Sequence, residues 1–287
     1  MPEGDTIFRA ARTLHRALAG RTVTRFESVF PHLTRVDHDQ PLRGRVVERV
    51  ESRGKHLLMW LSGGLVLRTH MRMSGSWHLY RPGERWQRPR HDMRVVIATT
   101  EFEAIAFRVP VAEFLPAGDV ERQRDLHALG PDPLSDAFDE AEAAARMAER
   151  GDAAVADVML DQRAMAGVGN IYKSETLFAC RVNPFTLVRD LEPATIERLV
   201  AAAAKLLRAN VADGSGSGIV TYTGLRRTTG RSDPSARLWV YGRAGKPCRR
   251  CGTPVSRRKH GPNVRSTYWC ETCQPEDGRS AANSDPV

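Results

Sequence analysis

The sequence predicts an α+β protein of several domains: a β-sandwich with an N-terminal helix, a helical domain, and a small β-hairpin module that carries four cysteines. Three observations predict this fold class. Short alternating or β-branched apolar segments fill the first 115 residues, alanine-rich segments with helical spacing follow residue 135, and two Cys-x2-Cys pairs lie near the end. With 287 residues, of which 41% are hydrophobic, the chain can bury a substantial core.

The N-terminal part is expected to begin with a helix. Residues 6–18 place apolar side chains at helical spacing, and Gly20 follows as a stop signal. Glycine turns then separate short strands, which is typical of a sandwich or a barrel. The expected strands are 21–28, 45–52, 56–61, 65–70, 93–98 and 103–107.

The second part changes to a helical period after a proline-bearing connector at 130–133, with helices expected at 135–150, 153–160 and 195–210. Between them lies Gly167-Val168-Gly169-Asn170, immediately before a further helix. Glycines let a phosphate approach the backbone, so the amides of this helix start and the Asn170 carboxamide could bind one in a helix-two-turn-helix arrangement. A tight turn with Asn170 as a helix cap is the alternative.

Four cysteines form the most specific local pattern, Cys248-x2-Cys251 and Cys270-x2-Cys273, with eighteen residues between the pairs. They suit a tetrahedral structural zinc with no open position for catalysis. Two disulfides or four unrelated thiols are the alternatives. The first twenty residues lack a long apolar run, so we expect no secretory signal and a reducing cytoplasm, which favours zinc. Cys180 lies in an apolar run and is expected to be a buried small side chain.

The residues around the cysteines are strongly basic. From 226 to 265 the chain carries twelve Lys or Arg side chains and one acid, and the whole chain has a net charge of +9. Such a stretch attracts polyanions, and the phosphate backbone of a nucleic acid is the expected partner. A membrane surface is a poor alternative, because no apolar stretch approaches twenty residues. The second alternative is a basic face that is solvated and binds no partner.

The first residues offer a nucleophile if Met1 is removed, because Pro2 then becomes a terminal secondary amine. An α-amino group has a reference pKa of about 7.7–8.0, so an appreciable fraction is unprotonated near neutral pH, unlike lysine at about 10.4. Attack on a masked aldehyde carbon would give a cationic iminium, which is an electron sink. A trimmed, disordered terminus is the alternative.

Together these features resemble the Fpg/Nei family of formamidopyrimidine-DNA glycosylases and endonucleases VIII. The landmarks are Pro2-Glu3-Gly4, the Arg53-to-Leu58 segment, the Asp161-to-Glu175 helix-two-turn-helix signature, and Val240-Tyr241-Gly242-Arg243 before the cysteines. The Pro-Glu-Gly start resembles the endonuclease VIII branch, which favours oxidised pyrimidines, and the high Arg and Ala content suggests an actinobacterial-type member. The resemblance implies a catalytic β-sandwich at 2–115, a linker at 116–134, a helix-two-turn-helix domain at 135–235, a zinc finger at 236–275 and a disordered tail at 276–287.

The resemblance implies a bifunctional DNA glycosylase and AP lyase of base excision repair. Pro2 is the implied nucleophile at C1′ of the damaged nucleotide, and β,δ-elimination from the iminium would leave a one-nucleotide gap. Glu3 is implied as the general acid, which requires a pKa raised by burial or neighbours. Lys55 is implied as a hairpin lysine that contacts phosphate and assists proton transfer. The alternative for Glu3 is an exposed acid near the terminus, and the alternative for Lys55 is a solvated cation.

Three more residues are implied to bind the DNA. Asn170 and Arg265 would bind phosphates that flank the lesion, and Met73 would fill the hole left by the extruded nucleotide. Core packing is the alternative for Met73. The family's other void-filling residues have no clear match here, and Arg108 is only a candidate.

The chain departs from the family at Thr6, where many members carry a second acid, and Asp5 lies one place earlier. The expected cofactor is one structural zinc ion, and the expected partner is damaged double-stranded DNA. A monomer without organic cofactor or membrane contact, cytoplasmic and associated with the nucleoid, is expected. The glycine stretch at 213–218 predicts a flexible loop. Two other functions stay open: an enzyme acting on oxidised purines, and a zinc-finger DNA-binding protein without catalysis.

Overall fold

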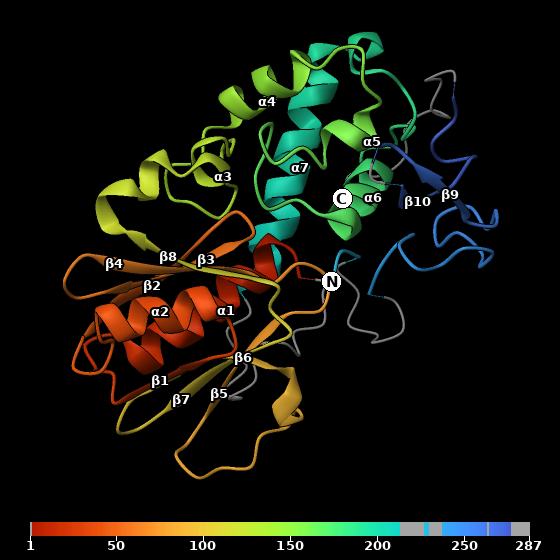
Figure 1. Cartoon of the computed structure of the whole chain (residues 1–287). Coiled ribbons are helices and arrows are strands. Elements are labelled where there is room, and N and C mark those ends of the chain that lie inside the picture. The colour runs from red at the N-terminus through yellow and green to blue at the C-terminus, as the bar shows by residue number, and fades with distance from the viewer. Residues whose placement is uncertain (1, 213–226, 230–236, 263, 277–287) are drawn as a thin grey trace. The chain divides into compact units, whose positions relative to one another are not determined.

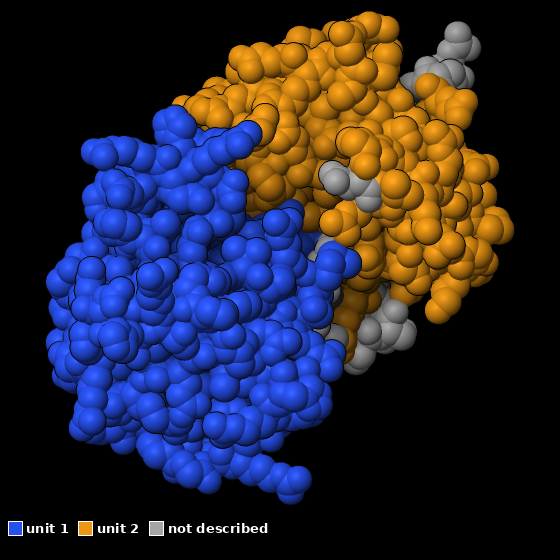
Figure 2. Space-filling view, in the orientation of Figure 1, with its two compact units in different colours: residues 1–128, 213–224 blue, residues 129–212, 225–287 orange. Residues whose placement is uncertain are grey.

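The computed structural model describes residues 2–212, 227–229, 237–262 and 264–276. Of these, residues up to 128 belong to one compact unit, unit 1, and residues from 129 onward to a second, unit 2 (Figure 2). The predicted loop at 213–218 and all but the first residue of the predicted tail lie outside the described residues. No helix in the described ranges is long and apolar enough to cross a membrane.

Unit 1 is a sandwich of two four-stranded antiparallel sheets, in the orders β1-β6-β7-β5 and β2-β3-β4-β8 (Figure 1). The predicted sandwich with an N-terminal helix is confirmed. Its strands are β1 Arg25–Ser28, β2 Val47–Arg53, β3 His56–Leu61, β4 Leu65–His70, β5 Ser76–Tyr80, β6 Met93–Ala98, β7 Glu103–Phe107 and β8 Val111–Pro116. Its helices are α1 Gly4–Leu18, α2 Pro31–Asp39, η1 Arg90–Asp92, η2 Ala117–Arg122 and α3 Arg124–His127.

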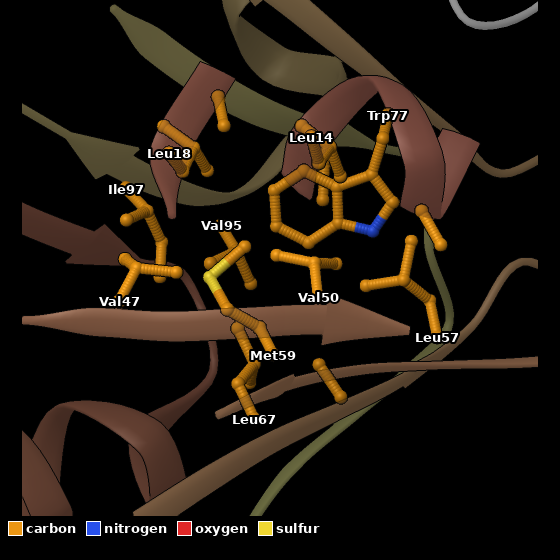
Figure 3. Close-up of a cluster of buried hydrophobic side chains, with 14 of the residues drawn as sticks. Leu14, Leu18, Val47, Val50, Leu57, Met59, Leu67, Trp77, Val95 and Ile97 are labelled. Carbon is orange, nitrogen blue, oxygen red and sulfur yellow. The ribbon is translucent and has the colours of Figure 1, made fainter. Parts of the chain in front are cut away.

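The core of unit 1 lies between the two sheets and helix α1 (Figure 3). Leu14 enters it from the helix, Met59 from β3 and Trp77 from β5, and all three are fully buried. The Trp77 indole N–H donates to the Thr69 hydroxyl at 3.1 Å, so its polar atom is satisfied and links the two sheets. Burying one large apolar side chain contributes about 1.5–3 kcal/mol, so this core fixes α1 against the β2–β3 hairpin.

Unit 2 is helical and ends in a two-stranded hairpin, as predicted. The Asp139 carboxylate accepts the Glu142 backbone N–H at 2.9 Å, and this cap makes the first helix begin later than residue 135, the expected start. The elements are α4 Glu140–Ala148, α5 Val155–Val158, α6 Asn170–Ala179, η3 Val188–Asp190, α7 Pro193–Ala212, β9 Ser256–His260 and β10 Arg265–Trp269.

Candidate active site and nucleic-acid interface

The N-terminal segment is ordered from Pro2 onward. Pro2 and Glu3 are buried, and the Glu3 carbonyl accepts the N–H groups of Thr6 at 2.9 Å and Ile7 at 3.1 Å. Asp5, the acid one place before the position of the family's second acid, is fully buried and accepts a hydrogen bond from Arg9 at 3.2 Å. The start of α1 therefore holds two carboxyl groups and Pro2 inside the protein.

Helix α1 runs alongside strand β2, which places the N-terminus near the tip of the β2–β3 hairpin. The Val50 N–H donates to the His15 Nδ1 at 3.1 Å, and the Gly20 N–H donates to the Val47 carbonyl at 2.8 Å. From His15 back to Glu3 the helix extends about 18 Å, and from Val50 the strand extends about 17 Å to the hairpin tip. The N-terminus and the hairpin tip thus lie at the same end of unit 1.

The hairpin tip consists of Gly54 and Lys55, between the paired residues Arg53 and His56. Gly54 has a φ of 56° while that of Lys55 is not positive, and a two-residue loop with a positive φ at its first position alone is a type II′ turn, which favours glycine there. The Lys55 side chain is half-buried. The turn fixes Lys55 at the end of the sheet that the N-terminus reaches.

Two histidines lie beside Lys55, and the sequence did not indicate them as site residues. His56 and His70 pair across β3 and β4, with ring centroids 4.8 Å apart. Burial, together with the nearby Arg68, Arg72 and Lys55, lowers the pKa of His56 to about 2 and that of His70 to about 4. Both rings are therefore neutral at neutral pH. The His70 Nδ1 accepts the Arg72 N–H at 3.0 Å, which leaves the ring proton on Nε2 as a donor.

Met73 lies on the tight turn between β4 and β5. The Gly75 N–H donates to the Met71 carbonyl at 2.9 Å, and a Cβ at Gly75 would lie 2.6 Å from that oxygen, so the turn requires glycine. Met73 is 54% exposed. Core packing, the alternative considered for Met73, is therefore wrong.

In unit 2, Asn170 and Arg265 are neighbours through strand β10. The Asn170 Nδ2 donates to the Ser266 carbonyl at 2.8 Å, and the buried Lys173 ammonium donates to the Thr267 hydroxyl at 2.8 Å. These two bonds fasten α6 to β10 beside Arg265. Gly169 occupies the helix cap position, so the alternative of Asn170 as a simple cap is wrong.

Glu175 fastens the segment that leads into the finger. This fully buried carboxylate accepts the backbone N–H groups of Trp239 at 2.7 Å, Val240 at 2.9 Å and Tyr241 at 2.8 Å, and also the Thr228 hydroxyl. Glu175 ends the predicted helix-two-turn-helix signature, but the sequence indicates no function for its side chain. Its contacts reach more than fifty residues along the chain, which local patterns do not indicate.

The four finger cysteines meet in one cluster. Their sulfur atoms lie within 4.8 Å of one another, at 3.4 Å for Cys251 and Cys270 and 4.0 Å for Cys248 and Cys273. These distances exclude disulfides, whose sulfurs lie about 2.05 Å apart. A tetrahedral zinc with Zn–S bonds of about 2.3 Å would separate its ligands by about 3.8 Å, so the cluster fits structural zinc. Burial raises the pKa of Cys180 to about 11, so this thiol is not a nucleophile at neutral pH.

Three family models match successive parts of the chain. They are the formamidopyrimidine-DNA glycosylase N-terminal domain at 1–110, its H2TH domain at 129–221, and the zinc finger found in FPG and IleRS at 245–275. A probable endonuclease 8 2 from Streptomyces coelicolor is 43% identical over 277 residues, which cover 96% of this chain and 94% of the relative. The chain belongs to the Fpg/Nei family. This confirms the predicted enzyme class, a bifunctional DNA glycosylase and AP lyase of base excision repair.

Other members of the Fpg/Nei family support the same assignment. The DNA-(apurinic or apyrimidinic site) lyase Nei2 of Mycolicibacterium smegmatis is 38% identical, with 96% of this chain and 99% of the relative covered. A formamidopyrimidine-DNA glycosylase from Gloeobacter violaceus is 36% identical, with 96% of each covered. The Lactococcus lactis Fpg structure with N7-benzyl-Fapy-dG DNA has a TM-score of 0.81 at 22% identity, covering 96% of this chain and 100% of that one, and shows the fold. The predicted actinobacterial-type endonuclease VIII relationship is confirmed.

Proposed function

We propose that this enzyme removes oxidised bases, pyrimidines preferentially, from damaged double-stranded DNA through a Schiff base on Pro2. The observation that carries the proposal is the buried Pro2-Glu3 pair at the start of α1, at the same end of unit 1 as the Lys55 hairpin. A nucleophile placed in an ordered, partly dry environment keeps its orientation toward a bound sugar. Removal of Met1 is required, because only a free Pro2 nitrogen carries the lone pair.

The chemistry follows from that amine. The Pro2 nitrogen attacks C1′ and gives up its proton, the bond from C1′ to the base breaks, and the base leaves with a proton. The bond from C1′ to the ring oxygen then breaks as that oxygen takes up a proton, which gives the iminium on the Pro2 nitrogen. The resulting iminium acidifies the C2′ hydrogen, so its loss expels the 3′ phosphate, and a second elimination expels the 5′ phosphate. Glu3, buried beside Pro2, would open the deoxyribose ring and move protons during imine formation. Asp5 is a second buried carboxyl near this position, where the family's acid is replaced by Thr6.

The remaining site residues would bind the DNA. Lys55, beside two neutral histidines, would contact a phosphate and assist proton transfer. Asn170 and Arg265 would bind phosphates flanking the lesion, which their shared contact at β10 supports. The exposed Met73 would fill the space left by the extruded nucleotide.

Cofactor, assembly and location complete the proposal. One zinc ion held by Cys248, Cys251, Cys270 and Cys273 would order the finger, since its binding energy in finger peptides is about 10–16 kcal/mol. No step of the reaction passes through it, because four thiolates leave no open position. We further propose a monomer without organic cofactor, acting in the cytoplasm on nucleoid DNA.

Excision from duplexes that differ only in the lesion tests the proposal. The lesions to compare are an oxidised pyrimidine, an oxidised or ring-opened purine, and an abasic site. We expect faster release of the pyrimidine and phosphate at both ends of the gap, because β,δ-elimination removes the sugar. Faster release of the purine would establish the Fpg-like alternative, which the similarity to the Gloeobacter enzyme favours. Tight binding without any cleavage would support the non-catalytic zinc-finger protein.

A further inference from the structure

The connection between β5 and β6 carries a second concentration of positive charge, outside the finger (Figure 1). Residues 81–90 contain four arginines and one acid, Glu84. Arg85 and Arg90 are exposed and Arg88 is partly exposed. We call these three side chains the crossover surface.

The backbone under the crossover surface is held in place by buried contacts. The Gln87 N–H donates to the Tyr80 hydroxyl at 3.0 Å, and that hydroxyl also bonds the His78 Nδ1 at 3.0 Å. The Trp86 ring packs edge-on against Phe107, with centroids 5.7 Å apart. Trp86 and Gln87 thus anchor the middle of the connection. Presenting arginines from a supported backbone lowers the entropy lost when they bind a ligand.

The connection returns to the end of unit 1 that carries Met73. Strand β5 starts at Ser76, just after the Met73 turn, and leads away from it; the connection then brings the chain back to Met93. Ser76 and Met93 both lie opposite Phe107 in the sheet register, so they are at the same end. Arg88 and Arg90 therefore approach the end of unit 1 at which the active site is proposed.

The charges of the crossover surface are only partly neutralised within the described residues, because Asp92 attracts Arg88 and Glu27 pairs with Arg90. Asp92, at the end of the connection, is paired with Arg108 at 2.8 Å, and Glu84 accepts the Arg81 backbone N–H at 2.9 Å. Arg85 and Arg88 form no ion pair in the described part of the chain. Arg90 forms an ion pair with Glu27 at 3.4 Å, but its side chain is 73% exposed, and an exposed pair of this kind contributes little.

We propose that Arg85, Arg88 and Arg90 bind phosphates of the DNA duplex beside the lesion, in addition to Asn170 and Arg265. This inference rests on the proposed function, because it requires a duplex at this end of unit 1. Three guanidinium groups on an ordered, acid-poor segment suit a regular row of phosphates, and such contacts release counterions without reading the base sequence. The crossover surface would give the enzyme affinity for undamaged DNA as well as for lesions.

The test compares R85Q/R88Q/R90Q with the control R16Q/R35Q/R43Q. Both remove three positive charges from unit 1, and Arg16, Arg35 and Arg43 are exposed residues that are not part of the proposed site. Fluorescence anisotropy would measure the affinity of the full-length zinc-loaded protein for an undamaged duplex over a range of salt concentrations. Each phosphate contact contributes about 0.9 to the slope of log K against log salt.

We expect the crossover variant to lose about two to three units of slope and about one to two orders of magnitude of affinity at low salt. The control should stay close to wild type, and R85K/R88K/R90K should recover most of the slope. Equal slopes for wild type and the crossover variant, or equal losses in the control, would overturn the inference. Wild-type protein that binds duplex without salt dependence would instead contradict the proposed function. If the triple variant melts early, the single changes R85Q and R90Q should each lose about one unit, and unchanged slopes there would also overturn it.

Discussion

We expect the hydrogen bonds of Glu175 to be the main contacts that hold the segment leading into the zinc finger against α6. Its two oxygens are fully buried with the side chain and accept three backbone N–H groups and one hydroxyl, in bonds that are buried or partly buried. E175Q keeps the size of the side chain but replaces one oxygen with an NH₂ group. That group cannot accept, so two donors of the protein would face another donor.

The magnitude follows from the number of bonds lost. A hydrogen bond to a charged group contributes about 1.5–3 kcal/mol, and the penalty for a buried unpaired donor is similar. Two lost bonds predict about 3–5 kcal/mol of local destabilisation, once incomplete additivity is allowed for. Because about 1.4 kcal/mol is tenfold, amide exchange of residues 239–241 should accelerate at least about a hundredfold.

Hydrogen exchange read by mass spectrometry on the peptide spanning 237–243 would measure this effect. E197Q is the matched control, since Glu197 is an exposed acid on α7. We expect fast exchange in E175Q, wild-type exchange in E197Q, and little change in strands β3 and β4 of unit 1. Wild-type protection of residues 239–241 in E175Q would refute the assignment of Glu175 as the anchor.

Three further predictions test the interface, a buried histidine and the metal. R265A should lower the salt slope of DNA binding by about one unit in an anisotropy titration, and an unchanged slope would remove Arg265 from phosphate binding. Burial, with Arg88 nearby, lowers the pKa of His78 to about 4, so the unfolded chain takes up a proton between pH about 6.5 and 4 that the folded protein does not. On acidification from pH 7 to 4, wild type should therefore lose about 2 kcal/mol more free energy of unfolding than H78Q, after allowance for solvent screening. Urea titrations at both pH values would measure this difference, and equal losses in the two proteins would show that His78 is not its source. Removal of zinc with a chelator should release one ion per chain and unfold residues 245–275 while β3 and β4 keep their exchange protection, and a protected finger without metal would be the contrary result.

The strands with clear apolar patterns were predicted closely. The bounds of β3, β4, β6 and β7 match the expected ranges, because alternating or β-branched residues between glycine turns determine them locally. Strand β5 was missed because all five of its residues are buried, so it shows no alternation. Its polar side chains bond one another instead, with the Ser76 hydroxyl 3.0 Å from the His78 Nε2 and the Tyr80 hydroxyl 3.0 Å from the His78 Nδ1.

Two other elements carry weak sequence signals for different reasons. Strand β8 lies at a sheet edge and ends at Pro116, where the missing N–H costs little. Helix α2 begins with Pro31 and fully buries one residue, Leu33, so it has no apolar stripe to detect. Such elements are determined by tertiary packing rather than by local pattern.

Some residues of the candidate site could likewise be predicted from local sequence, and others depend on tertiary contacts. Pro2, Glu3, Lys55, Asn170, Arg265 and the four cysteines could be chosen from the sequence because they stand in short motifs. The neutral pair of His56 and His70 depends on the register of β3 with β4, and the role of Glu175 depends on a segment more than fifty residues away. The crossover surface depends on Trp86 and Gln87 folding back onto the sheet.

The most direct measurement of the central claim is borohydride trapping on a duplex that contains an abasic site. Protein with a confirmed Pro2 terminus would be compared with a version extended by one residue ahead of Pro2, and peptide mass spectrometry would locate any adduct. The account predicts a covalent adduct on the Pro2 peptide of the free-terminus protein and none with the extended version. An adduct on a lysine, or no adduct with either protein despite tight DNA binding, would contradict it.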